Sequence, residues 1–128
     1  VFLQSLPPTQ ARAQAAPAPD GAAMRRGEAL YGDHCAACHG ERGEGAAGLY
    51  PPLAGNRAVA LQPPHNVIKA ILHGGFAPAT AANPRPFGMP PFAQVLSDAE
   101  VADVATYIRN AWRPAAPAVT TLDVLQAR

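Results

Sequence analysis

Residues 34–40 read "HCAACHG", and this stretch contains the motif that decides how the rest of the chain is interpreted. Cys35, Cys38 and His39 form a C-x-x-C-H pattern. Two thiols about one helical turn apart can add to the two vinyl groups of a haem, and the next residue then projects its imidazole toward the iron. The pattern therefore predicts one c-type haem, bound covalently through Cys35 and Cys38, with His39 as the proximal ligand.

Zinc binding and thiol redox chemistry fit the two cysteines less well. A zinc ribbon needs a second pair of ligands, and the chain has only 2 cysteines. A thioredoxin-type C-x-x-C motif follows a strand in a βαβ unit, whereas the flanking residues here have a helical pattern. A chance match of the motif is the remaining alternative.

A second stretch, "PFGMPPF" at residues 86–92, holds a methionine in a proline-rich loop. A methionine side chain normally fills gaps in a packed core, so its place in a stiff, irregular loop points to a different role. Met89 lies far enough along the chain from His39 to reach the other face of the haem. We predict that Met89 is the distal ligand, and that the other candidate donors have packing, capping or surface roles. Those donors are Met24, His34, His65 and His73.

The composition is that of one domain with a modest core. The 128 residues include 15 prolines but only 4 Phe, 3 Tyr and 1 Trp, so a large apolar cofactor would complete the core. A net charge of +1 with scattered Lys and Arg argues against a nucleic-acid partner. The sequence has no apolar run long enough for a transmembrane helix. Any membrane association is therefore expected through partners or through segments outside this sequence.

Helical periodicity appears in three parts of the chain, and no stretch alternates well enough to predict a strand. Asp20 can cap the first helix, Pro63 suits the first position of the second, and Ser97 with Glu100 forms a capping box for the third. The sequence predicts an all-α domain of three to five short helices around one haem, with long loops. The three predicted helices cover residues 20–34, 63–73 and 97–112.

The sequence divides into four expected segments. Residues 1–6, "VFLQSL", are the end of a preceding helix or the remnant of a secretion signal. A parallel between "VFLQSLPP" and "TYIRNAWRP" near the C-terminus favours a preceding helix. Residues 7–20 form a Pro/Ala-rich linker, residues 21–113 the haem domain and residues 114–128 a C-terminal tail.

The chain resembles class I cytochromes c over about residues 20–113. The resemblance rests on "CAACHG", "PPLAG", "GMPPF" and the C-terminal "LSDAEVADVATYIRNAW". In that family the N-terminal helix crosses the C-terminal helix through a glycine and an aromatic residue four positions later. Gly27 and Tyr31 match these positions and are expected to face Val104 and Tyr107.

The resemblance also implies roles for two residues beside the haem. The family has a proline, two before a leucine, whose carbonyl accepts a hydrogen bond from the ligating histidine, and Pro51 matches it. An arginine of the family holds a haem propionate. Arg57 is the nearest candidate, although its offset from Pro51 departs from the family pattern.

A closer resemblance is to the last haem domain of the multi-haem cytochrome subunits of bacterial membrane-associated alcohol, gluconate and FAD-dependent glucose dehydrogenases. It rests on "YPPLAGN", "NVIKAILHGG" and "PFGMPPFAQVL". It implies an electron carrier on the periplasmic side of the membrane, not an enzyme. The implied partners are a PQQ- or flavin-dependent dehydrogenase subunit and a quinone or cytochrome acceptor. This chain departs from the family in having a single C-x-x-C-H motif.

Two other functions stay open at this point. A haem enzyme or gas sensor would need an open distal position, and therefore an unbound Met89. A docking module would use the haem only to stabilise the fold.

Overall fold

The two longest helices, α1 (Gly21–His34) and α5 (Asp98–Asn110), begin at the caps that the sequence predicts. The Asp20 carboxylate accepts a hydrogen bond from the first turn of α1 at 2.6 Å. Ser97 and Glu100 form a reciprocal capping box at the start of α5. These side chains satisfy backbone N–H groups that have no partner within the helix. Both predicted helices are confirmed.

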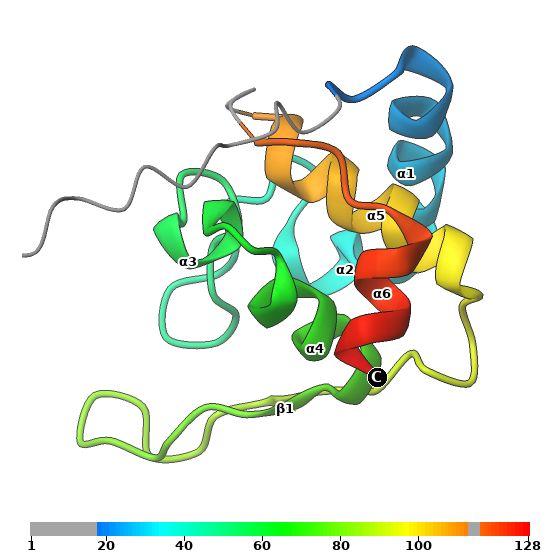
Figure 1. Cartoon of the computed structure of the whole chain (residues 1–128). Helices are drawn as coiled ribbons and strands as arrows, with labels where there is room; N and C mark the ends of the chain where they lie inside the picture. Colours follow the sequence, from blue (N-terminus) through cyan, green and yellow to red (C-terminus); the bar gives the residue numbers. More distant parts are fainter. Residues whose placement is uncertain (1–17, 113–115) are drawn as a thin grey trace, which may run out of the picture.

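Helices α1 and α5 cross in close contact (Figure 1). A Cβ atom added at Gly27 would lie 2.6 Å from Tyr107 Cβ, and it would also collide with the backbone carbonyl of Asp103. The Tyr31 ring lies 5.5 Å from the Tyr107 ring, between centroids. Gly27 and Tyr31 therefore face Tyr107, as the family resemblance implies. The helices approach this closely because glycine has no side chain at the crossing point.

Five short elements connect the two long helices: α2 (Ala36–His39), α3 (Arg57–Ala60), α4 (His65–His73), β1 (Gly75–Phe76) and β2 (Gly88–Met89). Helix α4 begins at His65 rather than at Pro63, with Pro64 as its N-cap residue. The strands pair antiparallel, with Gly75 opposite Met89. The expectation of no strand is therefore wrong here, because a two-residue strand is too short to show an alternating pattern.

The C-terminal tail contains a helix that the sequence pattern did not predict, α6 (Thr121–Ala127). The segment leading into it is held on α5 by buried polar side chains. Val119 N donates to Thr106 Oγ1 at 2.9 Å, and Ala116 N donates to Asn110 Oδ1 at 3.2 Å. These bonds satisfy buried backbone groups, so residues 116–128 belong to the packed domain.

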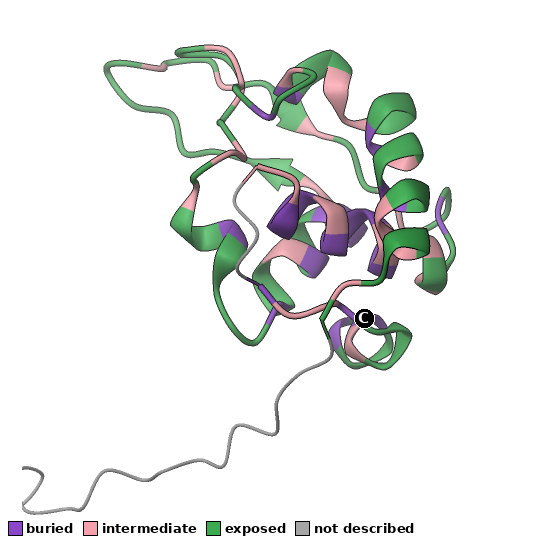
Figure 2. Cartoon of the chain, turned by 90° about the horizontal axis from the view of Figure 1, so that it is seen from above, coloured by how far each residue is buried: buried purple, intermediate pink, exposed green. Residues whose placement is uncertain are grey.

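The computed structural model describes residues 18–112 and 116–128. The expected segment 1–6 and most of the linker 7–20 lie outside these residues. Buried residues gather where α5 meets α1, α4 and α6 (Figure 2). In the described part of the chain, no helix is both long and apolar enough to cross a membrane. The all-α fold class is confirmed, with the two-stranded sheet as an addition.

Candidate haem site

The C-x-x-C-H motif lies at the junction of α1 and α2. Cys35 directly follows α1, and α2 carries Cys38 and His39 on a single helical turn. His39 N donates to Cys35 O at 3.0 Å, which fixes the turn between the first cysteine and the histidine. Gly40 ends α2 with a φ of 83°, a conformation that favours glycine.

The imidazole of His39 is held by the loop that follows α2. His39 Nδ1 lies 2.9 Å from Pro51 O. A carbonyl oxygen can only accept a hydrogen bond, so Nδ1 is the donor, and in the Nδ1–H tautomer the lone pair of Nε2 is free to bind a metal. His39 as a whole residue is only 9% exposed. This arrangement holds the imidazole in a fixed orientation, with Nε2 left as the nitrogen that can ligate.

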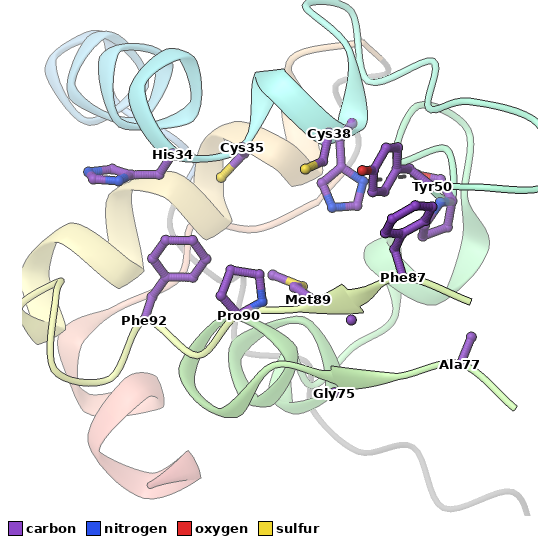
Figure 3. A pocket seen from close by; sticks show the side chains of 13 residues that line it. His34, Cys35, Cys38, Tyr50, Gly75, Ala77, Phe87, Met89, Pro90 and Phe92 are labelled. Carbon is purple, nitrogen blue, oxygen red and sulfur yellow. Dashed lines mark hydrogen bonds between the residues drawn. The ribbon is translucent and has the colours of Figure 1, made fainter. Parts of the chain in front are cut away.

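Met89, on β2, lies in the same site as the motif. Two adjoining cavities of about 160 and 190 Å³ are both lined by Cys35, His39, Pro51 and Met89. Cys38 also lines the first of them. Figure 3 shows the two cysteines on one side of the first cavity and Met89 on the other. A long loop thus returns the methionine sulfur to the site of the histidine.

The rest of the lining is mainly apolar. Leu53, Val67, Ile71 and Ile108 line the second cavity, and Phe87 and Phe92 line the first. Burial raises the pKa of the Cys35 thiol to about 11, so this thiol is neutral at pH 7 when free.

These features fit a c-type haem better than a bare metal ion. Two thiols, an imidazole and a thioether around an apolar cavity match the vinyl groups, the iron and the flat macrocycle of a haem. Residues 18–112 and 116–128 hold no group of three or more His, Cys, Asp or Glu residues that could bind a metal ion alone.

Arg57 is the exposed first residue of α3 and lines a hollow beside the second cavity. The two hollows share Leu53, Val59 and Ile108. That Arg57 holds a haem propionate stays a prediction.

The other candidate donors are placed as follows. His34 lines the rim of the first cavity, with its ring 5.8 Å from the Phe92 ring. His65 and His73 are exposed at the two ends of α4, and Met24 is half-buried on α1. Of these four residues, only His34 lines a cavity that His39 also lines.

Sequence reasoning missed two aromatic side chains at the site. The rings of Tyr50 and Phe87 lie 5.4 Å apart, and both line the first cavity. Their only signal in the sequence is that each lies just before a residue singled out for another reason, Pro51 and Met89.

Comparison with protein families matches residues 24–112 to Cytochrome c. The chain belongs to the cytochrome c family. The expected fold is therefore confirmed, and membership implies a covalently bound c-type haem. Arg57 lies inside the matched region.

Several curated proteins are similar to this cytochrome c domain. Over 103 residues, 80% of this chain, it is 39% identical to the "Alcohol dehydrogenase (quinone), cytochrome c subunit" of Gluconacetobacter polyoxogenes. It is 38% identical over 104 residues to the "Gluconate 2-dehydrogenase cytochrome c subunit" of Pantoea cypripedii. The matches cover 22% and 24% of those two subunits. The expected resemblance to dehydrogenase cytochrome subunits is confirmed.

A smaller relative matches over most of its own length. "Cytochrome c-554(548)" of Halomonas halodenitrificans is 42% identical over 73 residues, which are 57% of this chain and 78% of the relative. The domain is thus similar both to part of large dehydrogenase subunits and to most of a small cytochrome.

Proposed function

We propose that this domain transfers single electrons through one haem, attached at Cys35 and Cys38 and ligated by His39 and Met89. The observation that carries the proposal is the shared cavity lining: His39 and Met89 belong to elements far apart in the chain, yet both line the same two cavities. When bound, the haem supplies an iron that cycles between two oxidation states.

The residues of the domain suit electron transfer better than chemistry on a substrate. Pro51 O holds His39 in the tautomer that can ligate. With Met89 as the second axial ligand, no iron position is left for a substrate. The apolar lining excludes water, and a thioether ligand favours the reduced iron more than a second imidazole does. The expected potential is therefore comparatively high.

The dehydrogenase relatives support a place in a respiratory chain. We propose that the domain receives electrons from a catalytic dehydrogenase subunit that carries PQQ or flavin, and passes them toward a quinone or another respiratory acceptor. This proposal draws on the names of the relatives, which include a quinone-linked alcohol dehydrogenase. Thioether attachment of haem takes place outside the bacterial cytoplasm, so the proposed location is the periplasm or the periplasmic face of the inner membrane.

Replacing Met89 in the haem-loaded protein tests the ligand assignment. Met89→Ala should abolish the sulfur-to-iron charge-transfer band of the oxidised spectrum and let the reduced protein bind CO. Met89→His should keep a six-coordinate iron and lower the potential by roughly 0.1–0.3 V, a fraction of the range that axial ligands span. Spectroscopy and redox titration measure both effects.

Met24→Ala is the matched control, because Met24 lies on α1 and lines neither cavity. It should leave the spectrum and the potential unchanged. A wild-type protein that lacks the band and binds CO readily would contradict the proposal and favour an enzyme or gas sensor with an open distal site.

A further inference from the structure

An aromatic contact joins the two sides of the candidate haem site. The rings of Tyr50 and Phe87 lie 5.4 Å apart between centroids, with their planes inclined by 37°. Figure 3 shows the two rings next to each other at one end of the cavity that both residues line. Tyr50 comes from the loop after α2, and Phe87 comes from the chain just before β2.

Tyr50 and Phe87 each lie in the chain beside a segment that positions one of the two proposed iron ligands. Tyr50 precedes Pro51, whose carbonyl accepts the hydrogen bond from His39. Phe87 directly precedes β2, which carries Met89. The Tyr50–Phe87 pair therefore links the loop that orients the histidine to the strand that presents the methionine.

The chain after Met89 is anchored by backbone bonds. Phe92 N donates to Ile71 O at 3.0 Å, and Ala93 N donates to Leu72 O at 3.1 Å. Both acceptors lie in the last turn of α4, where helical carbonyls have no partner within the helix. These bonds fix the C-terminal side of the methionine.

The chain before Met89 is attached differently. Residues 77–86 form an exposed loop between the strands, closed locally by bonds between Thr80 and Asn83. At Phe87 this loop returns to the domain, and there the Phe87 ring meets the Tyr50 ring. On the N-terminal side of Met89, β2 pairs with β1 through Gly88 opposite Phe76. The Tyr50–Phe87 contact adds to this pairing and ties the same end of β2 to the loop after α2.

We propose that Tyr50 and Phe87 are positioning residues, whose ring contact holds β2 over the site and keeps the Met89 sulfur on the iron. This inference rests on the proposed role of Met89 as a ligand. In the simplest version of this proposal, β2 has a closed state in which Met89 is bound and an open state in which Met89 is released. The ring contact favours the closed state.

The expected size of the effect follows from the strength of such contacts. Tilted aromatic pairs favour the state that contains them by a factor of roughly 2 to 10. Phe87 is 56% exposed, so water competes for part of its surface and the lower half of that range applies. The apparent affinity of a ligand that binds only the open state rises in proportion to the open fraction. Loss of the pair should therefore strengthen such binding roughly 2- to 5-fold.

Imidazole titration of the oxidised, haem-loaded protein tests the inference, because imidazole competes with Met89 for the iron. Tyr50→Ala and Phe87→Ala should each lower the apparent Kd of imidazole roughly 2- to 5-fold. The double variant should differ little from either single variant, since both remove the same contact. The charge-transfer band of the ligand-free protein checks that Met89 remains bound at the start of the titration.

Two control variants separate the ring contact from other effects. Tyr50→Phe keeps the ring and should retain the wild-type Kd. Leu49→Ala removes a side chain that is 50% exposed and that lies in the same loop but does not line the first cavity, and it should also match the wild type.

The inference is overturned if Tyr50→Ala and Phe87→Ala bind imidazole like Leu49→Ala, or if their effects simply multiply in the double variant. A wild-type protein without the charge-transfer band overturns the proposed ligation by Met89 instead. The two failures are therefore distinguishable.

Discussion

At the scale of single residues, Tyr31 connects the haem motif to the core. Its side chain is 2% exposed, and its hydroxyl donates to Gly40 O at 2.6 Å, directly after His39. Its ring also lies 5.3 Å from the ring of Trp112. Burial, with smaller contributions from neighbouring Cys35 and Glu44, raises the pKa of Tyr31 to about 12.

Tyr31→Phe should lower the free energy of unfolding by about 1 kcal/mol at pH 8, because Gly40 O loses its buried donor. In the wild type, Tyr31 ionises near pH 10 when unfolded and near pH 12 when folded. The stability that the neutral Tyr31 hydroxyl contributes is therefore fully present below pH 10 and is lost as the pH rises through 12. Urea unfolding of the haem-loaded proteins between pH 8 and 12 should show that the free energy of unfolding falls less with pH in the variant than in the wild type. Equal pH dependence in the two proteins would contradict the role assigned to the Tyr31 hydroxyl.

At the scale of secondary-structure elements, the crossing of α1 and α5 depends on close packing at Gly27. An ion pair between Arg26 and Asp103, with an N–O distance of 2.6 Å, lies beside the crossing. Its arginine is 59% exposed, and exposed ion pairs contribute little to stability. The contact of Gly27 with Asp103 and Tyr107 leaves no room for a methyl group. Packing, more than charge, therefore sets how closely the helices approach.

Gly27→Ala should destabilise the domain by about 2 kcal/mol or more, because α1 must move away from α5. Gly32→Ala on the same helix is the matched control, since a Cβ atom there meets nothing within 4 Å. The control should stabilise the domain by about 0.5–1 kcal/mol through higher helix propensity. Thermal unfolding of the haem-loaded variants measures the difference. Equal midpoints for the two variants would show that the crossing tolerates a side chain.

At the scale of the whole molecule, the C-terminal segment and the loop before α4 are held together through α5. Arg109 is 3% exposed, and its guanidinium donates to Val59 O, Leu61 O, Gln62 Oε1 and Pro117 O at 2.7–3.1 Å. Burial lowers its pKa, and these acceptors replace the water that it loses. Helix α6 then packs on α5 and α4, and none of its residues lines either of the two cavities.

Val124→Ala should therefore lower stability without changing the haem properties. Val124 is 0% exposed on α6, so the truncation should cost about 2 kcal/mol in transfer and cavity free energy. Leu125→Ala is the control, because Leu125 on the same helix is 60% exposed and its truncation should cost less than about 0.5 kcal/mol. Thermal unfolding should separate the two variants, while redox titration should give both the wild-type potential. A shifted potential in Val124→Ala would show that α6 acts on the haem site.

Features that depend on residues close together in the chain could be predicted from the sequence. The C-x-x-C-H motif, the Asp20 cap and the capping box of α5 each lie within one or two helical turns, so their spacing alone predicts them. Helix α6 has a similar signal, a capping box between Thr120 and Asp123, which the proline-rich tail obscured. Helix α3 and the strands are too short for their periodicity to be recognised.

The sequence by itself determined the C-x-x-C-H motif, the all-α class and the two long helices, because these follow from local spacing. The crossing of the two helices was implied by the family resemblance. Only the tertiary structure decided that the tail packs as α6 and that Tyr50 meets Phe87. Each of these depends on residues far apart in the chain. Which distant side chains meet is set by how buried surfaces fit together in three dimensions, and no short stretch of sequence contains that information.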